Sequence, residues 1–260
     1  MPVAHLDSRA LISVSGPDCR PFLHSLLTQD VSTLSDGEVR YGALLGPQGR
    51  LLFDLFLFGR EDAVLLDCAV TRRDDLMRRL GLYRLRADVR IEADPRPVFV
   101  AWNDAIPDWP SDPRLPNLGR RSVGSSEAGA SLAAWRSHCL VHGVPDSEDF
   151  ALDSDYPIDA NLDLLNGIDF KKGCFIGQEV TSRMKRRGKI KSRLVPIRFE
   201  GGLPPRGTEI LNGDLRAGEI RSGQDGRAMA MLRLDRIDGR LMAGDQPIEA
   251  ERHEWLLSSS

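Results

Sequence analysis

The sequence predicts an α+β protein with mostly antiparallel sheet and a small β-barrel in its C-terminal part. Alternating apolar segments separated by glycine, proline and aspartate turns predict strands and hairpins in the first hundred residues. Two segments among them have helical spacing, and beyond Lys191 the chain changes to short strands between glycine turns. A length of 260 residues also exceeds the roughly 100–200 residues of one domain, so we expect more than one.

The first hundred residues alternate predicted strands and helices. "RALISVSG" (9–16) alternates like a strand, and "VRYGALLGPQGRLLFDLFLFGREDAVLLDCAV" (39–70) predicts three strands joined by the turns "GPQG" and "GRED". "LRADVRIEA" (85–93) predicts a returning strand. The segment 17–29 predicts a helix whose apolar face comprises Phe22, Leu23, Leu26 and Leu27.

Local signals complete the element order. Thr71 and Asp74 have the spacing of a capping box for a helix over 73–83. The proline-rich segment 103–124 predicts a loop or a connection between subdomains, because proline cannot donate to a ladder, and a short helix follows over 131–143.

The C-terminal part has short strands spaced as in a small barrel, "RLVPIRFEGG", "GTEILNG", "RAGEIRSG" and "AMAMLRLDRI". We therefore place a domain boundary near residue 190. The expected organisation is a region of two interwoven α+β subdomains at 1–190, a barrel domain at 191–255 and a frayed tail at 256–260.

Composition excludes several classes of protein. Hydrophobic residues make up 41% and charged residues 28% of the chain, and no apolar run approaches the roughly 18–20 residues that span a bilayer, so we expect a soluble protein without a membrane partner. The first sixteen residues show no targeting pattern, which predicts a cytoplasmic location. A net charge of -3 gives no global attraction to nucleic acid.

The four cysteines form no C-x-x-C pair, which disfavours a disulfide framework or a preformed zinc or iron–sulfur ligand set. A reducing cytosol is the simple interpretation. The histidines show no metal-ligand spacing; His138 and His142 lie four residues apart but lack the acid of an H-E-x-x-H motif, so we interpret them as structural.

Residues 154–193 carry the densest chemistry. Carboxylates and amides there have the donors and acceptors that recognise ring amides and amines of a pterin or purine, although each could equally cap a turn. These residues are Asp155, Asp159, Asn161, Asp163, Asn166, Asp169 and, further along, Gln178.

"KKGCFIGQE" predicts a structured loop. Gly173 and Gly177 allow close backbone approach on either side of the apolar pair Phe175–Ile176, which would insert into a core. Cys174 lies beside Lys172 and before possible helix-start amides, both of which favour a thiolate. The alternative is a buried cysteine that acts as a small hydrophobe.

The basic run Arg183–Arg193 has two interpretations. It is typical of a solvated surface segment, and it could also contact phosphates or a polyanionic tail. It lacks the interleaved aromatic residues that build a base-stacking platform.

"KGCFIGQEVTSR" resembles the signature of the folate-binding YgfZ family, relatives of the glycine-cleavage aminomethyltransferase. "FLHSLLTQDV", "DPRLPNLG", "PIDANLD" and "RAGEIRS" support the resemblance, which covers nearly the whole chain. It implies ferredoxin-like antiparallel subdomains around a folate-sized channel, closed by the C-terminal barrel.

The resemblance also implies a function. Family members are implicated in assembly or repair of iron–sulfur clusters, including those of tRNA-modifying enzymes, with tetrahydrofolate as ligand. It maps the activity onto Cys174 with Lys172 beside it, and implies a non-hydrolytic factor that serves iron–sulfur client or assembly proteins rather than a conventional enzyme. No feature of the sequence argues strongly for a dimer, so we expect a monomer. The residues expected at the folate are Asp54, Asp159, Asn161, Gly173, Gly177, Gln178, Glu179 and Arg183.

Two departures from the family pattern keep alternatives open. Many relatives have Glu where this chain has Asp159, and aminomethyltransferases carry a doubled acid where this chain has Phe53 followed by Asp54. A folate-dependent one-carbon transferase with Asp54 as acid/base is one alternative, although a lone Asp in a strand could equally face solvent. An RNA-binding module centred on Arg183–Arg193 is the other.

Overall fold

The computed structural model describes residues 2–103, 106, 108–188 and 190–257, and the chain divides into two compact units. Unit 1 is Met1–Trp135 with Leu165–Val180, and unit 2 is Arg136–Leu164 with Thr181–Ser260. The division falls within α3 (Leu132–Val141) and α4 (Gln178–Arg187). The split expected at residues 190 and 255 stays a prediction of domain organisation.

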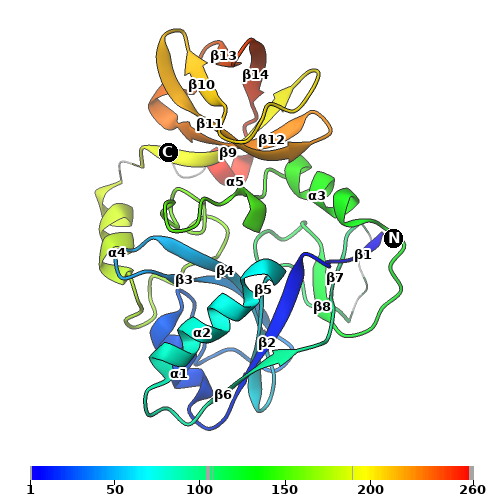
Figure 1. Cartoon of the computed structure of the whole chain (residues 1–260), viewed down its shortest axis with the longest axis vertical. Helices are drawn as coiled ribbons and strands as arrows, with labels where there is room; N and C mark the ends of the chain where they lie inside the picture. Colours follow the sequence, from blue (N-terminus) through cyan, green and yellow to red (C-terminus); the bar gives the residue numbers. More distant parts are fainter. Residues whose placement is uncertain (1, 104–105, 107, 189, 258–260) are drawn as a thin grey trace. The chain divides into compact units, whose positions relative to one another are not determined.

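An antiparallel sheet forms the larger part of unit 1. Its order is β3-β4-β5-β2-β6, and α1 (Cys19–Leu26) and α2 (Arg73–Arg84) pack against it (Figure 1). The inner strand β4 is buried at every position, which explains its nearly continuous apolar sequence. The strands are β2 (Arg9–Ser15), β3 (Val39–Leu45), β4 (Leu51–Gly59), β5 (Ala63–Ala69) and β6 (Arg90–Asp94).

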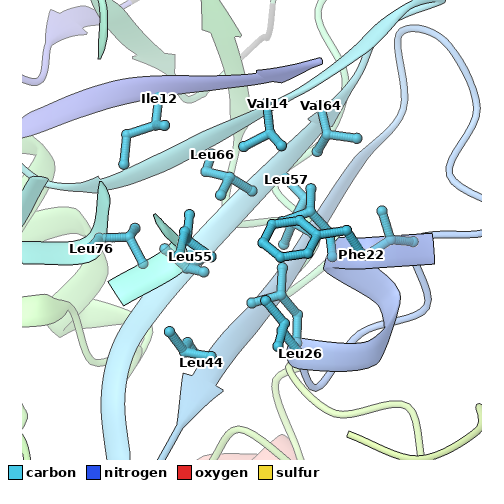
Figure 2. Close-up of a cluster of buried hydrophobic side chains, with 14 of the residues drawn as sticks. Ile12, Val14, Phe22, Leu26, Leu44, Leu55, Leu57, Val64, Leu66 and Leu76 are labelled. Atoms are coloured by element: carbon cyan, nitrogen blue, oxygen red, sulfur yellow. The ribbon is translucent and has the colours of Figure 1, made fainter. Parts of the chain in front are cut away.

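Strand alternation gives this sheet two different faces. Figure 2 shows Phe22 and Leu26 of α1 and Leu76 of α2 beside Leu55 and other apolar side chains of one face. All of them are buried, so the helix face predicted from residues 17–29 is confirmed. The opposite face carries the side chains of the residues that alternate with these along each strand.

A second sheet in unit 1 has the order β1-β7-β8, with β1 at Val3–His5, β7 at Val98–Ala101 and β8 at Arg120–Val123. The loop predicted over 103–124 is therefore wrong at its end. Its last proline is Pro116, so the residues of β8 keep the N–H groups that the ladder with β7 needs. Residues 104, 105 and 107 of that prediction lie outside the described residues.

Unit 2 contains a closed barrel of strand order β10-β11-β12-β9-β14-β13, which confirms the predicted barrel (Figure 1). Alternate residues such as Val195 and Ile197 of β9 fill its interior. Its strands are β9 (Ser192–Phe199), β10 (Glu209–Asn212), β11 (Leu215–Gln224), β12 (Arg227–Arg233), β13 (Leu241–Ala243) and β14 (Gln246–Ala250).

Short helical turns complete the description. These are η1 (Val70–Arg72), η2 (Ser147–Asp149), η3 (Leu234–Arg236) and α5 (Glu254–Leu257). Within the described ranges, no helix has both the length and the apolar character that crossing a bilayer requires.

Three local predictions are wrong. Thr71 is not a helix cap, because η1 leads directly into α2 and Arg72 occupies the cap position without a side-chain hydrogen bond. The strand expected over 85–93 begins only at Arg90, because a turn with Leu85 at a φ of 45° follows α2. The expected tail begins inside α5, where Leu256 is buried; residues 258–260 lie outside the described residues.

Candidate functional site

The cysteine loop (residues 170–177) is fastened to α1 by a buried lysine. Lys172 donates from Nζ to the carbonyl oxygen of Leu27 at 2.7 Å and to that of His24. These carbonyls lie at the C-terminal end of α1, where they lack helical partners and attract a cation. Burial lowers the pKa of Lys172 to about 8, against the opposing influence of Asp30, Asp169 and the Cys174 sulfur. Lys172 thus anchors the loop and places a positive charge near Cys174.

Two glycines bring the end of this loop against the β3–β4 turn. Gly177 has a φ of 81°, and a Cβ there would lie 2.9 Å from the Gly46 oxygen. Gly49 has a φ of 74°, and a Cβ there would lie 2.9 Å from Cβ of Val180. Any larger residue would push the loop away, so the close approach expected at Gly177 is present. A Cβ on Gly173, by contrast, would meet only His24 Nε2, at 3.8 Å.

Cys174 is exposed, so its interpretation as a buried small hydrophobe is wrong. Its neighbour Phe175 is buried, and Ile176 packs on the core of unit 1 as expected. Cys19, Cys68 and Cys139 are buried. Burial raises the pKa of Cys68 to about 12 and also raises that of Cys19, so these two remain protonated thiols. Cys174 is the cysteine that a partner can reach.

The residues after the loop form the first turn of α4. Gln178 begins this helix four residues after Cys174, and its Nε2 lies 3.5 Å from the Gly173 oxygen. Glu179 and Arg183 are exposed on the same helix. Gly173, Gly177, Gln178 and Glu179 therefore accompany Lys172 and Cys174 in unit 1, whereas Arg183 belongs to unit 2.

Asp54 belongs to a buried ion-pair network on the sheet face opposite the helices. Its Oδ2 lies 3.0 Å from Nη1 of Arg9, and Nε of Arg9 lies 2.5 Å from Oδ1 of Asp67. Asp67 also accepts from Nη1 of Arg121 at 2.8 Å. The interpretation of Asp54 as a solvent-facing residue is wrong, because it is 4% exposed. The network continues to Asp112 and Arg114, and the Arg121 guanidinium lies over the Phe56 ring.

Asn161 is a structural residue of unit 2. It is fully buried; its Nδ2 donates to the Leu194 oxygen at 2.7 Å, and its Oδ1 accepts from Arg193 at 3.2 Å. Arg193 also donates to both oxygens of Asp163, at 2.9 and 3.0 Å. The backbone oxygen of Asp159 accepts from the Leu194 N–H. This segment is tied to β9 through these bonds.

Other predicted polar residues have protein partners too. Asp155 pairs with Arg221 at 2.9 Å in unit 2, and burial raises its pKa. In unit 1, Asp169 accepts from the backbone N–H of Lys171 at 2.7 Å, and Asn166 donates to the Pro113 oxygen at 3.0 Å.

The basic run is partly neutralised. Lys185 lies 3.1 Å from Asp163, which Arg193 also contacts. Arg183, Arg186, Arg187 and Lys191 are exposed, and Lys189 lies outside the described residues. The RNA contact through this run stays a prediction.

His138 and His142 stack edge to face at 4.5 Å between ring centroids.

A hollow of about 510 Å³ lies in unit 1 beside the cysteine loop. One wall is held by Gln29, whose Nε2 donates to the Tyr41 and Asn166 oxygens at 2.9 and 2.8 Å. It is lined by Gln29, Arg40, Tyr41, Pro113, Asn166, Ile168, Asp169, Phe170 and Lys171. Over the part of the chain that the structure describes, no group of three or more His, Cys, Asp or Glu could hold a metal ion.

Comparisons with known proteins add the family relationship. A family model described as the CAF17 C-terminal beta-barrel domain matches residues 191–258. Human mitochondrial iron–sulfur cluster assembly factor IBA57 is 31% identical over 282 residues, which cover 91% of this chain and 78% of the human protein. An IBA57 homologue of Phaeosphaeria nodorum is 33% identical over 230 residues, covering 77% of this chain and 56% of that protein.

A solved structure shows the fold. The glycine cleavage system aminomethyltransferase T from Bartonella henselae superposes with a TM-score of 0.77 at 17% identity, covering 98% of this chain and 86% of that one. The expected aminomethyltransferase-like α+β fold with a C-terminal barrel is confirmed.

The expected cytoplasmic location is contradicted, because these relatives are mitochondrial proteins. That expectation rested on the absence of a targeting pattern in the first sixteen residues and on a cysteine spacing that is typical of a reducing cytosol. The resemblance to YgfZ is supported only at a coarser level. The chain belongs to the IBA57 family of iron–sulfur cluster assembly factors, built on a fold that it shares with the aminomethyltransferase.

Proposed function

We propose that this chain takes part in iron–sulfur cluster assembly and that Cys174 is its covalent contact with the cluster or with a persulfide. The observation that carries this proposal is an exposed thiol on a loop whose two ends are fixed, by Lys172 at α1 and by Gly177 at the β3–β4 turn. A reactive group needs such support, because a loosely held residue loses its geometry.

The cluster is cargo shared with a partner. Iron–sulfur clusters are usually held by four thiolates, and the other cysteines of this chain are buried. One thiolate from Cys174 leaves the remaining ligands to a partner protein. The Lys172 ammonium lies within electrostatic reach of the sulfur.

Spectroscopy of reconstituted protein tests this role. Iron, sulfide and glutathione are added anaerobically, so that glutathione supplies the missing thiolates, and visible absorption of the repurified protein is recorded. Wild type and Cys139→Ala should retain a cluster chromophore, and Cys174→Ser should lose it while keeping its thermal midpoint, since the side chain is exposed. Equal chromophores in wild type and Cys174→Ser would refute the role of the thiol.

Tetrahydrofolate is a separate proposal, supported by the aminomethyltransferase-like fold. The residues expected to hold it fit unevenly. Asp54 is occupied by Arg9, and the Asn161 amide is occupied by Leu194 and Arg193, so neither offers a free group to a pterin. The hollow beside the cysteine loop has a volume within the range of ligand pockets, and Lys171 at its rim suits an anionic tail.

Calorimetric titration of tetrahydrofolate under anaerobic conditions tests the ligand. Micromolar binding by wild type and Cys174→Ala, weakened in Lys171→Glu, would support folate in the hollow. No binding by wild type would remove the ligand and leave the cluster proposal intact.

A one-carbon transferase is not favoured by the geometry. Its acid/base would be Asp54, but that carboxylate is buried and paired with Arg9 at 3.0 Å. Turnover of methylene-tetrahydrofolate that Asp54→Asn abolishes would overturn this conclusion.

A further inference from the structure

A histidine and an aspartate lie beside the cysteine loop. His24, in the last turn of α1, places Nδ1 2.9 Å from Oδ1 of Asp30. Asp30 also accepts from the Ser32 N–H at 2.8 Å, the Ser32 hydroxyl at 2.6 Å and the Thr33 hydroxyl at 3.0 Å. Partial burial raises the pKa of Asp30, but the bonds from Ser32 and Thr33 outweigh it and hold that pKa far below its usual range. Asp30 is therefore a fixed anion.

This anion selects the tautomer of His24. The Val31 N–H also approaches Nδ1, at 3.4 Å, but the carboxylate contact is shorter and charge-assisted. A carboxylate oxygen 2.9 Å from a ring nitrogen requires a proton between the two atoms, which places the imidazole proton on Nδ1. In the neutral imidazole, Nε2 then holds the free lone pair.

Nε2 faces the loop just before the thiol. A Cβ built on Gly173 lies 3.8 Å from Nε2, and Lys172 binds the backbone oxygen of His24 itself. The imidazole is 25% exposed and Cys174 is exposed, so the cysteine side chain can change rotamer freely. The two groups share no hydrogen bond among those that the structure describes, and apo sites often tighten only when ligand binds.

We propose that His24, oriented by Asp30, is the general base that accepts the proton of Cys174 when the Cys174 sulfur bonds to iron or to an electrophilic carbon. This rests on the proposed role of Cys174. The S–H bond breaks, the sulfur electron pair forms the new bond, and the proton moves to Nε2. The resulting imidazolium is held by the Asp30 carboxylate, the arrangement of a base with its orienting acid.

The charged groups around this pair support one direction of transfer. Lys172 and Asp30 face it from the loop and from the segment after α1, and Asp169 lies within electrostatic reach of Lys172. A cation on the side of the sulfur and an anion on the side of the imidazole match the charges that the transfer creates.

Alkylation of the full chain by iodoacetamide tests the proposal without any cluster. The rate at Cys174 is followed by mass spectrometry from pH 6 to 10 in wild type, His24→Gln and Asp30→Asn. In this reaction the C–S bond forms, iodide leaves, and the thiol proton passes to His24. His5→Gln, which removes an exposed histidine of β1, is the matched control.

His24→Gln should slow alkylation at pH 7 about a hundredfold, which is the low end of what a positioned base contributes. Its rate should converge with wild type near pH 10, where hydroxide in solution can remove the thiol proton in place of the imidazole. The alkylation rate of Asp30→Asn at pH 7 should lie between those of wild type and His24→Gln, and the rate of His5→Gln should match wild type. Superimposable wild-type and His24→Gln profiles would overturn the proposal, as would an equal loss at every pH, which marks a structural effect. Neither result bears on reconstitution with Cys174→Ser, so failure here is separable from failure of the proposed function.

Discussion

Replacing Lys172 by methionine should change how the stability of unit 1 depends on pH. Lys172 is buried, and its pKa falls from 10.5 to about 8 because burial disfavours the ammonium. Methionine has a similar length and no charge. The substitution therefore removes one titrating group from beneath the cysteine loop and leaves the apolar stem in place.

The sign follows from proton binding. Between pH 8 and 10.5 the unfolded chain holds this proton more tightly than the folded chain, so the lysine makes stability rise with pH across that window. Each pKa unit corresponds to about 1.4 kcal/mol, which gives an upper limit of roughly 3 kcal/mol. Allowing for solvent screening at the loop, we expect about 2 kcal/mol.

Urea unfolding of wild type and Lys172→Met at pH 7.5, 9 and 10.5 measures this difference. The buried thiols also titrate in this range, but both proteins carry them, so their contribution cancels. Between pH 7.5 and 10.5, the free energy of unfolding of wild type should rise by about 2 kcal/mol relative to that of Lys172→Met. Parallel curves for the two proteins would refute the account of Lys172 as a buried, charged anchor.

Three further substitutions test the packing around the site. Asp67→Asn removes a fully buried carboxylate and leaves two buried guanidiniums without its negative charge. The free energy of unfolding in urea should fall by about 3 kcal/mol, while the exposed control Asp235→Asn should keep the wild-type midpoint. Gly177→Ala should cost about 1–3 kcal/mol by the same assay, because a Cβ clashes with backbone at a positive φ; an unchanged midpoint would contradict this contact. Leu85→Gly should raise the free energy of unfolding by about 1 kcal/mol, because Leu85 is 88% exposed and its φ of 45° is strained for any residue but glycine. A lower thermal midpoint would contradict this strain.

Local patterns predicted much of the fold. The alternation in β2, the apolar segments of β3 to β5 between turn residues and the glycine-spaced strands after Lys191 are short-range signals, and each formed the expected element. Gly177 and Cys174 belong to one contiguous motif, so their neighbourhood could be expected from the sequence. The family resemblance identified the loop but not what supports it.

Long-range partners could not be predicted in this way. In the sequence His24 is a single histidine with no neighbouring motif. Its proximity to Lys172 and Gly173 could not be predicted, because they are almost 150 residues away in the chain. Arg9 and Asp67 are likewise 58 residues apart. One signal was present: Asp54 interrupts an apolar strand, and a carboxylate buried on such a strand requires a cation.

The measurement that tests the central claim most directly is the activity of iron–sulfur enzymes in cells that lack their own copy of this protein and carry wild type, Cys174→Ser or Cys139→Ala at equal abundance. The account predicts that wild type and Cys139→Ala restore these activities and that Cys174→Ser does not. Full restoration by Cys174→Ser would contradict it.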